Sequence, residues 1–124
     1  MQAIKESELI LTEDGRIYHL GLHPKDLGDY VITVGDPKRV ERVSRHFDKI
    51  ELKNQKREFV THTGLLGKKR ISVIGTGIGP DNIDIMLNEI DALKNIDFKT
   101  RKIKKEFSKL HIIRMGTSGA LRED

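Results

Sequence analysis

The chain has 124 residues, the usual size of one domain, and it contains no cysteine, which excludes disulfide bonds and thiolate metal sites. Its 23 lysines and arginines against 19 aspartates and glutamates give a net charge of +4, which favours anionic partners. No apolar run approaches the roughly 20 residues that cross a bilayer, and residues 1–8 lack the apolar stretch of a secretory signal, so we expect a cytoplasmic chain with no membrane partner.

The most basic stretch of the chain is FKTRKIKKEFSK, at residues 98–109. It can be interpreted as a nucleic-acid contact or as a solvated loop or helix extension. Aromatic residues make up only 5% of the chain and form no platform on which bases would stack. Because a like-charge block without aromatics is typical of a solvated segment, we expect no nucleic-acid partner.

The first elements are predicted in the N-terminal third of the chain. Residues 1–17 are polar and mixed, which predicts a loosely held N-terminal arm. The β-branched and aromatic run Tyr30–Val34 predicts a strand that ends in a glycine turn. Pro37 suits the first turn of a helix, because its missing N–H would be unpaired there anyway. Apolar residues then recur at helical spacing to about residue 47.

The middle of the chain predicts strands and a hairpin. Residues 49–53 and 57–63 have the composition of short strands, and residues 65–69 that of a hairpin turn. Residues 70–74 form a further predicted strand that leads into the glycine-rich turn at 75–79. This succession indicates that the chain folds back on itself before the next helix.

A helix and a last strand complete the pattern. Asp81 is a plausible N-cap for the helix, and its apolar positions fall on one face: Ile83, Met86, Leu87, Ile90 and Leu93. After the basic stretch, residues 110–114 have the apolar composition of a buried strand. Strands that alternate with helices predict an α/β fold of three layers, with a mostly parallel or mixed central sheet flanked by helices. No linker divides residues 18–124, so we expect one domain there.

Three of the predicted strands run into glycine-rich turns, at residues 35–37, 75–79 and 116–119. Ligands of open α/β sheets bind outside the carboxyl ends of the strands. Glycines at these ends allow backbone N–H groups to approach an anion, and a following helix N-terminus adds a favourable field. The turns therefore predict an anion site at one edge of the sheet.

Arginines near these turns sharpen the prediction. Arg39 and Arg114 lie close to two of the turns, and Arg57 lies in the predicted strand between them. A guanidinium presents a planar fork of donors that matches phosphate oxygens, and the hydroxyl of Thr117 adds a donor beside Arg114. Position six of the glycine turn is Pro80, which excludes the dinucleotide fingerprint, and no Gly-Lys-Ser/Thr is present. The simplest ligand is phosphate.

Taken together, the motifs resemble a known family. The segments Gly35–Val40, Arg57–Phe59, Gly77–Gly79 and Ile113–Gly119 resemble the nucleoside phosphorylases of the uridine and purine phosphorylase superfamily. Their order and spacing are most similar to uridine phosphorylase, including the Tyr18–Leu22 segment ahead of the first strand. The resemblance runs from about residue 18 to the end of the chain.

The resemblance implies a phosphate site built by one subunit. The Gly35 amide and Arg39 would contact the anion, and Arg114, Gly116 and Thr117 would complete the set. Arg114 and Thr117 are the residues that we expect to act in catalysis. The co-substrate would be inorganic phosphate, with no bound cofactor.

The resemblance also implies residues that act across a subunit interface. Arg57 resembles an arginine that reaches the neighbouring phosphate site, and His19 resembles a histidine that reaches the 5′-hydroxyl of the neighbour's ribose, so a homo-oligomer is expected. Alternatively, His19 is an ordinary surface histidine. In some uridine phosphorylases the glutamate that matches Glu58 helps to hold a monovalent cation. Because residues 80–82 depart from the family pattern, we expect no metal here.

The implied reaction is phosphorolysis, in which phosphate attacks the anomeric carbon of a nucleoside and releases the base and ribose 1-phosphate. The similarity to uridine phosphorylase implies uridine as the nucleoside. Family members are about twice this length and bind the base and ribose with their second half. We therefore expect an N-terminal fragment that is inactive alone and self-associates through an uncovered sheet edge. The alternative hypothesis is a non-catalytic phosphate- or nucleotide-binding module.

Overall fold

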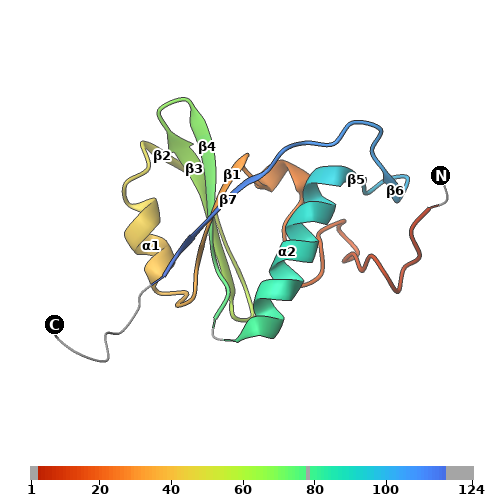
Figure 1. The fold of residues 1–124 in the computed structure, drawn as a ribbon, viewed down its shortest axis with the longest axis horizontal. Coiled ribbons are helices and arrows are strands. Elements are labelled where there is room, and N and C mark those ends of the chain that lie inside the picture. The colour runs from red at the N-terminus through yellow and green to blue at the C-terminus, as the bar shows by residue number, and fades with distance from the viewer. Residues whose placement is uncertain (1–2, 78, 117–124) are drawn as a thin grey trace, which may run out of the picture.

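The computed structural model describes residues 3–77 and 79–116. In chain order, its elements are a 3-10 helix at Pro24–Asp26, β1 (Tyr30–Val34), α1 (Arg39–Ser44), β2 (Lys49–Lys56), β3 (Phe59–Leu66), β4 (Lys69–Gly75), α2 (Pro80–Asn95), β5 (Ile96–Asp97), β6 (Lys102–Ile103) and β7 (His111–Met115). Figure 1 shows α1 and α2 on either side of the central sheet. The predicted three-layer α/β fold is therefore confirmed.

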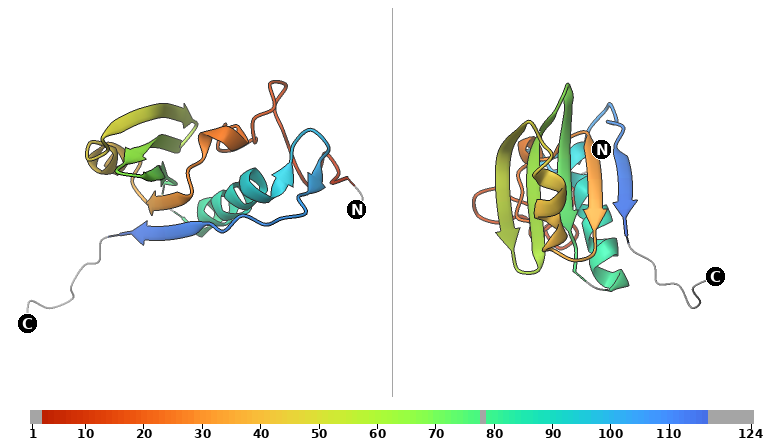
Figure 2. Two further views of the ribbon diagram at one scale, coloured as in Figure 1. Left: turned by 90° about the horizontal axis from the view of Figure 1, so that it is seen from above. Right: turned by 90° about the vertical axis from the view of Figure 1, so that its left-hand side faces the viewer.

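The central sheet is mixed and has the strand order β2-β3-β4-β1-β7. Strands β4, β1 and β7 run parallel, and β2, β3 and β4 form antiparallel pairs. Figure 2 shows β2 and β7 at opposite margins of this sheet. The register pairs Val34 with both Gly75 and Met115, so the carboxyl ends of all three parallel strands meet at one edge. The hairpin between β2 and β3 lies at the same edge, because Val60 also pairs with Gly75.

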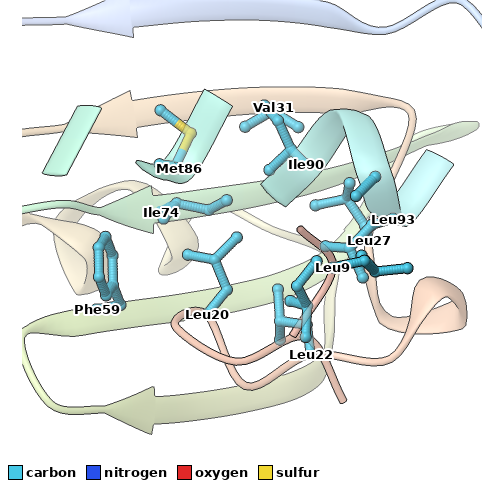
Figure 3. Packing of buried hydrophobic residues seen from close by; sticks show 12 residues of the cluster. Leu9, Leu20, Leu22, Leu27, Val31, Phe59, Ile74, Met86, Ile90 and Leu93 are labelled. Carbon is cyan, nitrogen blue, oxygen red and sulfur yellow. The ribbon is translucent and has the colours of Figure 1, made fainter. Parts of the chain in front are cut away.

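Alternation along the strands divides the core between the two faces of the sheet. Val31 packs in the larger cluster with Met86, Ile90 and Leu93 of α2, shown in Figure 3. The next residue, Ile32, points to the other face and packs in a smaller cluster with Val40 of α1. Successive side chains of a strand point to opposite faces, so a strand covered on both sides is apolar throughout.

The predicted boundaries of the first helix and the third strand are wrong by a few residues. Helix α1 begins at Arg39, whereas Pro37 belongs to the turn before it, and the helix ends at Ser44. Arg57 is not in a strand: its φ of 54° places it in the two-residue turn that joins β2 to β3. Tight hairpin turns require positive φ values, which propensity alone does not reveal for an arginine.

The prediction for α2 needs two corrections. The N-cap is Gly79 and not Asp81, which lies inside the first turn. Leu87 is 41% exposed, whereas Met86, Ile90 and Leu93 are buried. Residues three and four apart share a helix face, so the residue after Met86 is rotated about 100° away from the core.

The predicted buried strand at residues 110–114 is β7, and it is exposed. Ile112 is 43% exposed, Ile113 is 52% exposed and Met115 is 46% exposed. Among the residues that the structure describes, β7 pairs with β1 on one side and with no strand on the other. An apolar run identifies a strand but does not say whether other segments cover it.

The expectation of a loosely held arm is wrong for much of residues 1–17. Leu9 and Ile17 are only 4% and 3% exposed and join the larger core cluster. Arg101, from the basic stretch, donates hydrogen bonds to the carbonyl oxygens of Ile4 at 2.8 Å and Lys5 at 3.0 Å. The basic stretch thus contains β6, which pairs with β5, and its Arg101 fastens the arm. No helix in the described part of the chain has the length and apolar character to cross a membrane.

Candidate functional site

A pocket of about 180 Å³ opens at the edge where the carboxyl ends of the parallel strands meet. It is lined by residues that follow or end these strands and by the start of α2: Thr33, Val34, Gly35, Thr76, Gly77, Gly79, Ile83 and Arg114. The position agrees with the rule that ligands of α/β sheets bind beyond the carboxyl ends of strands. We call it the edge pocket.

Arg114 is the one arginine that lines the edge pocket among the described residues. Its backbone pairs with Thr33 across the β1–β7 ladder, so the two side chains share the face covered by α2. The guanidinium folds back over Gly116: a Cβ added there would lie only 2.9 Å from Nη1 of Arg114. Glycine at position 116 therefore leaves the room that this guanidinium occupies.

Gly35 lines the same pocket and lies against the second glycine turn. A Cβ added at Gly35 would have the carbonyl oxygen of Gly77 as its nearest contact, at 3.9 Å. The two turns are tied together, because the amide of Thr76 donates to the carbonyl oxygen of Val34 at 3.0 Å. Gly35 is thus presented beside Gly77 by a hydrogen bond between neighbouring strand ends.

The N-terminus of α2 completes the wall of the pocket. Gly79, the N-cap, has a φ of 124°, which only glycine adopts readily. Asn82 in the first turn donates from its side-chain amide to the carbonyl oxygen of Thr76 at 2.8 Å, which fastens the helix start to the turn. The 16-residue helix directs the positive end of its dipole toward the pocket, which favours an anion there.

The other predicted phosphate ligands lie outside the described lining of the pocket. Arg39 is the first residue of α1 and does not line the pocket. Gly116 lies beneath the Arg114 guanidinium. Thr117 lies outside the described residues. The structure thus brings Gly35 and Arg114 together and leaves the roles of Arg39 and Thr117 as predictions.

Arg57 and His19 lie together in a second group, which we call the Tyr18 cluster: Tyr18, His19, Lys56 and Arg57. Arg57 donates to the hydroxyl of Tyr18 at 3.2 Å, and the Lys56 ammonium lies 4.6 Å from the centre of the Tyr18 ring. The rings of Tyr18 and His19 meet edge to face, with centroids 5.0 Å apart. Cations over an aromatic face are attracted by its quadrupole. Arg57 and His19, which the sequence assigned to one neighbouring site, therefore both contact Tyr18.

Glu89 of α2 is a partner of His19 that the sequence did not reveal. Its carboxylate accepts from the backbone amides of His19 and Leu20 and lies 2.7 Å from Nδ1 of His19. Glu89 and His19 are 70 positions apart in the sequence, so no local pattern connects them. A carboxylate on a helix is usually solvated, so only the packing of the arm on α2 exposes this contact.

Comparison with known protein families identifies the family of this chain. Residues 29–124 match the family model described as the phosphorylase superfamily. The chain belongs to the phosphorylase superfamily. The resemblance that the sequence motifs predicted is thereby confirmed.

Individual relatives show how much of a phosphorylase-superfamily protein this chain represents. Uridine phosphorylase from Treponema pallidum is 37% identical over 107 residues, which are 86% of this chain and 36% of that protein. A DeoD-type purine nucleoside phosphorylase from Alkaliphilus metalliredigens is 31% identical over 86% of this chain and 40% of its own length.

The crystal structure of a Trypanosoma brucei nucleoside phosphorylase, described as having uridine phosphorylase activity, superposes with a TM-score of 0.82 at 37% identity. The superposition covers 93% of this chain and 40% of that one. This phosphorylase-superfamily chain thus spans about two fifths of the length of the relatives that it matches.

Proposed function

We propose that this chain supplies the phosphate-binding part of a nucleoside phosphorylase. In the proposed reaction, phosphate attacks the anomeric carbon of a nucleoside, uridine being the first candidate, and the base leaves as ribose 1-phosphate forms. The observation that carries the proposal is the edge pocket, where Arg114 and Gly35 line one small cavity at the carboxyl ends of the strands. Membership of the phosphorylase superfamily supports the same reaction class.

The chemistry of the pocket suits a phosphate dianion that must be held and still react. The guanidinium of Arg114 offers two parallel donors to two phosphate oxygens. The start of α2 adds a field of the same sign without a proton that can be lost. As the bond to the base breaks, the ribosyl group gains positive charge, and a phosphate fixed beside it stabilises that charge and then attacks. Catalysis here rests on placement and electrostatics.

The size of the edge pocket limits what this chain binds. About 180 Å³ is below the roughly 300–1,000 Å³ typical of pockets that enclose a small organic ligand. A phosphate ion fits such a volume, whereas a complete nucleoside needs further walls. Since the chain spans about two fifths of its relatives, we propose that it binds phosphate alone but does not cleave a nucleoside alone. In this proposal, Arg39 and Thr117 are further phosphate ligands.

The Tyr18 cluster is proposed to serve a second copy of the chain. Arg57 and His19 lie in one group through their contacts with Tyr18, and neither lines the edge pocket. An arginine suited to phosphate and a histidine suited to a ribose hydroxyl would then enter a neighbouring site together. A homo-oligomer in which each site takes residues from two subunits would account for this pairing.

A phosphate-dependent cleavage assay tests the proposed function. Uridine and inosine are incubated with and without inorganic phosphate, using this chain and a version extended through its natural reading frame. We expect release of the base by the longer protein only, and only with phosphate present. The longer protein with Arg114→Ala should lose this activity. Base release that does not require phosphate, or no release by the longer protein, would contradict the proposal.

The second candidate is a non-catalytic phosphate- or nucleotide-binding module. The small volume of the edge pocket favours it, because a pocket for an anion alone is compatible with binding and no reaction. Such a module would bind phosphate in calorimetry, and neither form would release a base from any nucleoside. The extended protein therefore separates the two candidates.

A further inference from the structure

Glu89 holds His19 by more contacts than a surface ion pair usually provides. Its Oε1 accepts from the amide of Leu20 at 2.8 Å and from the amide of His19 at 3.1 Å. Its Oε2 lies 3.2 Å from the same His19 amide and 2.7 Å from the ring nitrogen Nδ1. The Glu89 side chain is only 12% exposed, whereas the His19 side chain is 31% exposed.

The chemistry of a carboxylate decides which ring nitrogen of a neutral His19 carries the proton. An ionised carboxylate only accepts hydrogen bonds, so Nδ1 must donate to Oε2. The remaining nitrogen, Nε2, then carries a lone pair and presents an acceptor. The two backbone amides fix the carboxylate itself, so it cannot turn away without losing hydrogen bonds in a nearly buried position.

We propose that Glu89 is a positioning residue that locks His19 as the Nδ1–H tautomer and so presents Nε2 as an acceptor for a hydroxyl group. Its functional meaning rests on the proposed function, in which that hydroxyl is the 5′-hydroxyl of a nucleoside. The edge-to-face contact with Tyr18 also restrains the ring. Glu89 therefore acts through His19 and touches no reacting atom.

The alternative is a purely structural role for Glu89, since the carboxylate also fastens the arm to α2. The variant Glu89→Gln separates the two roles. The glutamine carbonyl oxygen can keep accepting from the amides of His19 and Leu20, and its amide group then faces Nδ1 as a donor. Nδ1 must then accept, and the proton moves to Nε2. A structural role alone predicts that the tautomer stays unchanged.

The test is nitrogen NMR of the 124-residue chain labelled with ¹⁵N-histidine. Spectra are recorded at about pH 8.5, above the ordinary imidazole pKa of about 6.5. We expect the wild-type His19 to show a protonated Nδ1 and an unprotonated Nε2, and Glu89→Gln to exchange the two. Asp91→Asn is the matched control, because it makes the same change of charge on α2 at a carboxylate bonded to Asn95. It should leave His19 unchanged.

Two outcomes would overturn the inference. One is a wild-type His19 with its proton on Nε2, which needs no variant and stands even if Glu89→Gln does not fold. The other is a folded Glu89→Gln chain whose His19 keeps the wild-type tautomer.

The link to function is measured separately, by titration of the longer protein of the cleavage assay with uridine and with 5′-deoxyuridine, without phosphate so that neither ligand is consumed. If uridine binds, Glu89→Gln should weaken it about three- to tenfold, the loss of one hydrogen bond, and should leave 5′-deoxyuridine unaffected. Equal weakening of both ligands would contradict the acceptor role of Nε2. If neither ligand binds to the longer protein, the proposed function loses support, whereas the tautomer result still decides the role of Glu89.

Discussion

Arg114 faces Thr33 across the parallel β1–β7 ladder, and both residues line the edge pocket. The two are 81 positions apart in the sequence but share a face of the sheet, because register partners of parallel strands point the same way. Their pairing places the guanidinium beyond the strand end and above Gly116. The arginine is thus held by an edge strand rather than by a loop.

Replacing Arg114 with alanine should weaken phosphate binding about ten- to hundredfold. A hydrogen bond to a charged group contributes about 1.5–3 kcal/mol, which corresponds to that range. The strand itself is exposed, so the free energy of unfolding should change by less than about 0.5 kcal/mol. Titration calorimetry with inorganic phosphate measures the first effect and urea unfolding the second. Arg45→Ala, at an exposed arginine after α1, serves as the control and should bind phosphate normally. Unchanged affinity in Arg114→Ala would remove the edge pocket as a phosphate site.

Replacing Gly35 with alanine should weaken phosphate binding without unfolding the chain. Gly35 lies outside the left-handed region, and its new Cβ would meet nothing closer than the Gly77 carbonyl oxygen at 3.9 Å. The methyl group would instead occupy room in the edge pocket. We expect the free energy of unfolding to change by less than about 1 kcal/mol and phosphate affinity to fall.

Gly64→Ala provides the contrast to Gly35→Ala. A Cβ at position 64 would lie 2.3 Å from the backbone carbonyl oxygen of Lys49, so this variant should be strongly destabilised. Urea unfolding of both variants checks the difference. Comparable losses of stability at the two positions would show that Gly35 is required by the fold rather than by the ligand.

The stability of the chain should fall as the pH drops below about 6.5, because of His62. Burial lowers the pKa of His62 below its ordinary value of 6.5, with Lys53 adding to the effect. His62 is only 9% exposed, and its Nδ1 lies 2.8 Å from the hydroxyl of Ser44. The unfolded chain therefore binds a proton at a higher pH than the folded chain does. Protonation favours unfolding, so the contribution is complete above pH 6.5 and is lost toward the lower folded pKa.

Urea unfolding between about pH 5 and 8 measures this effect, whose slope cannot exceed about 1.4 kcal/mol per pH unit for one proton. His62→Gln should remove the contribution of this residue, whereas His46→Gln, at an exposed position, should retain it. An identical pH dependence in wild type and His62→Gln would show that His62 is not responsible.

Arg101→Ala should release the N-terminal arm. The guanidinium donates to the carbonyl oxygens of Ile4 and Lys5, and the amide of Ile4 donates to the carbonyl oxygen of Arg101 at 2.7 Å. The backbone bond from Ile4 to position 101 remains in the variant, but loss of the guanidinium hydrogen bonds should cost about 1–3 kcal/mol locally and should increase amide hydrogen exchange in residues 4–11. Lys105→Ala, at an exposed position of the same basic stretch, is the control. Unchanged exchange in the arm of Arg101→Ala would mean that Leu9 and the core hold it without this contact.

The order of elements follows from local sequence pattern. The β-branched run at Tyr30–Val34 and the apolar residues Met86, Ile90 and Leu93 each specify an element, because side-chain spacing records the period of a strand or helix. The glycine turns that follow β1 and β4 lie at one edge of the sheet, as the sequence predicts. Glycine is needed where backbone must approach a ligand or another turn.

Contacts between distant segments were beyond the reach of local pattern. Strand order places Arg114 opposite Thr33, and packing of the arm on α2 brings Glu89 to His19. Neither contact can be predicted from the residues that surround either partner in the sequence. The apolar character of Ile113 likewise predicts burial, but the residue is 52% exposed, because burial depends on the surrounding segments. Secondary structure depends on interactions within a few residues, whereas the edge pocket and the tie on His19 depend on which elements become neighbours when the chain folds.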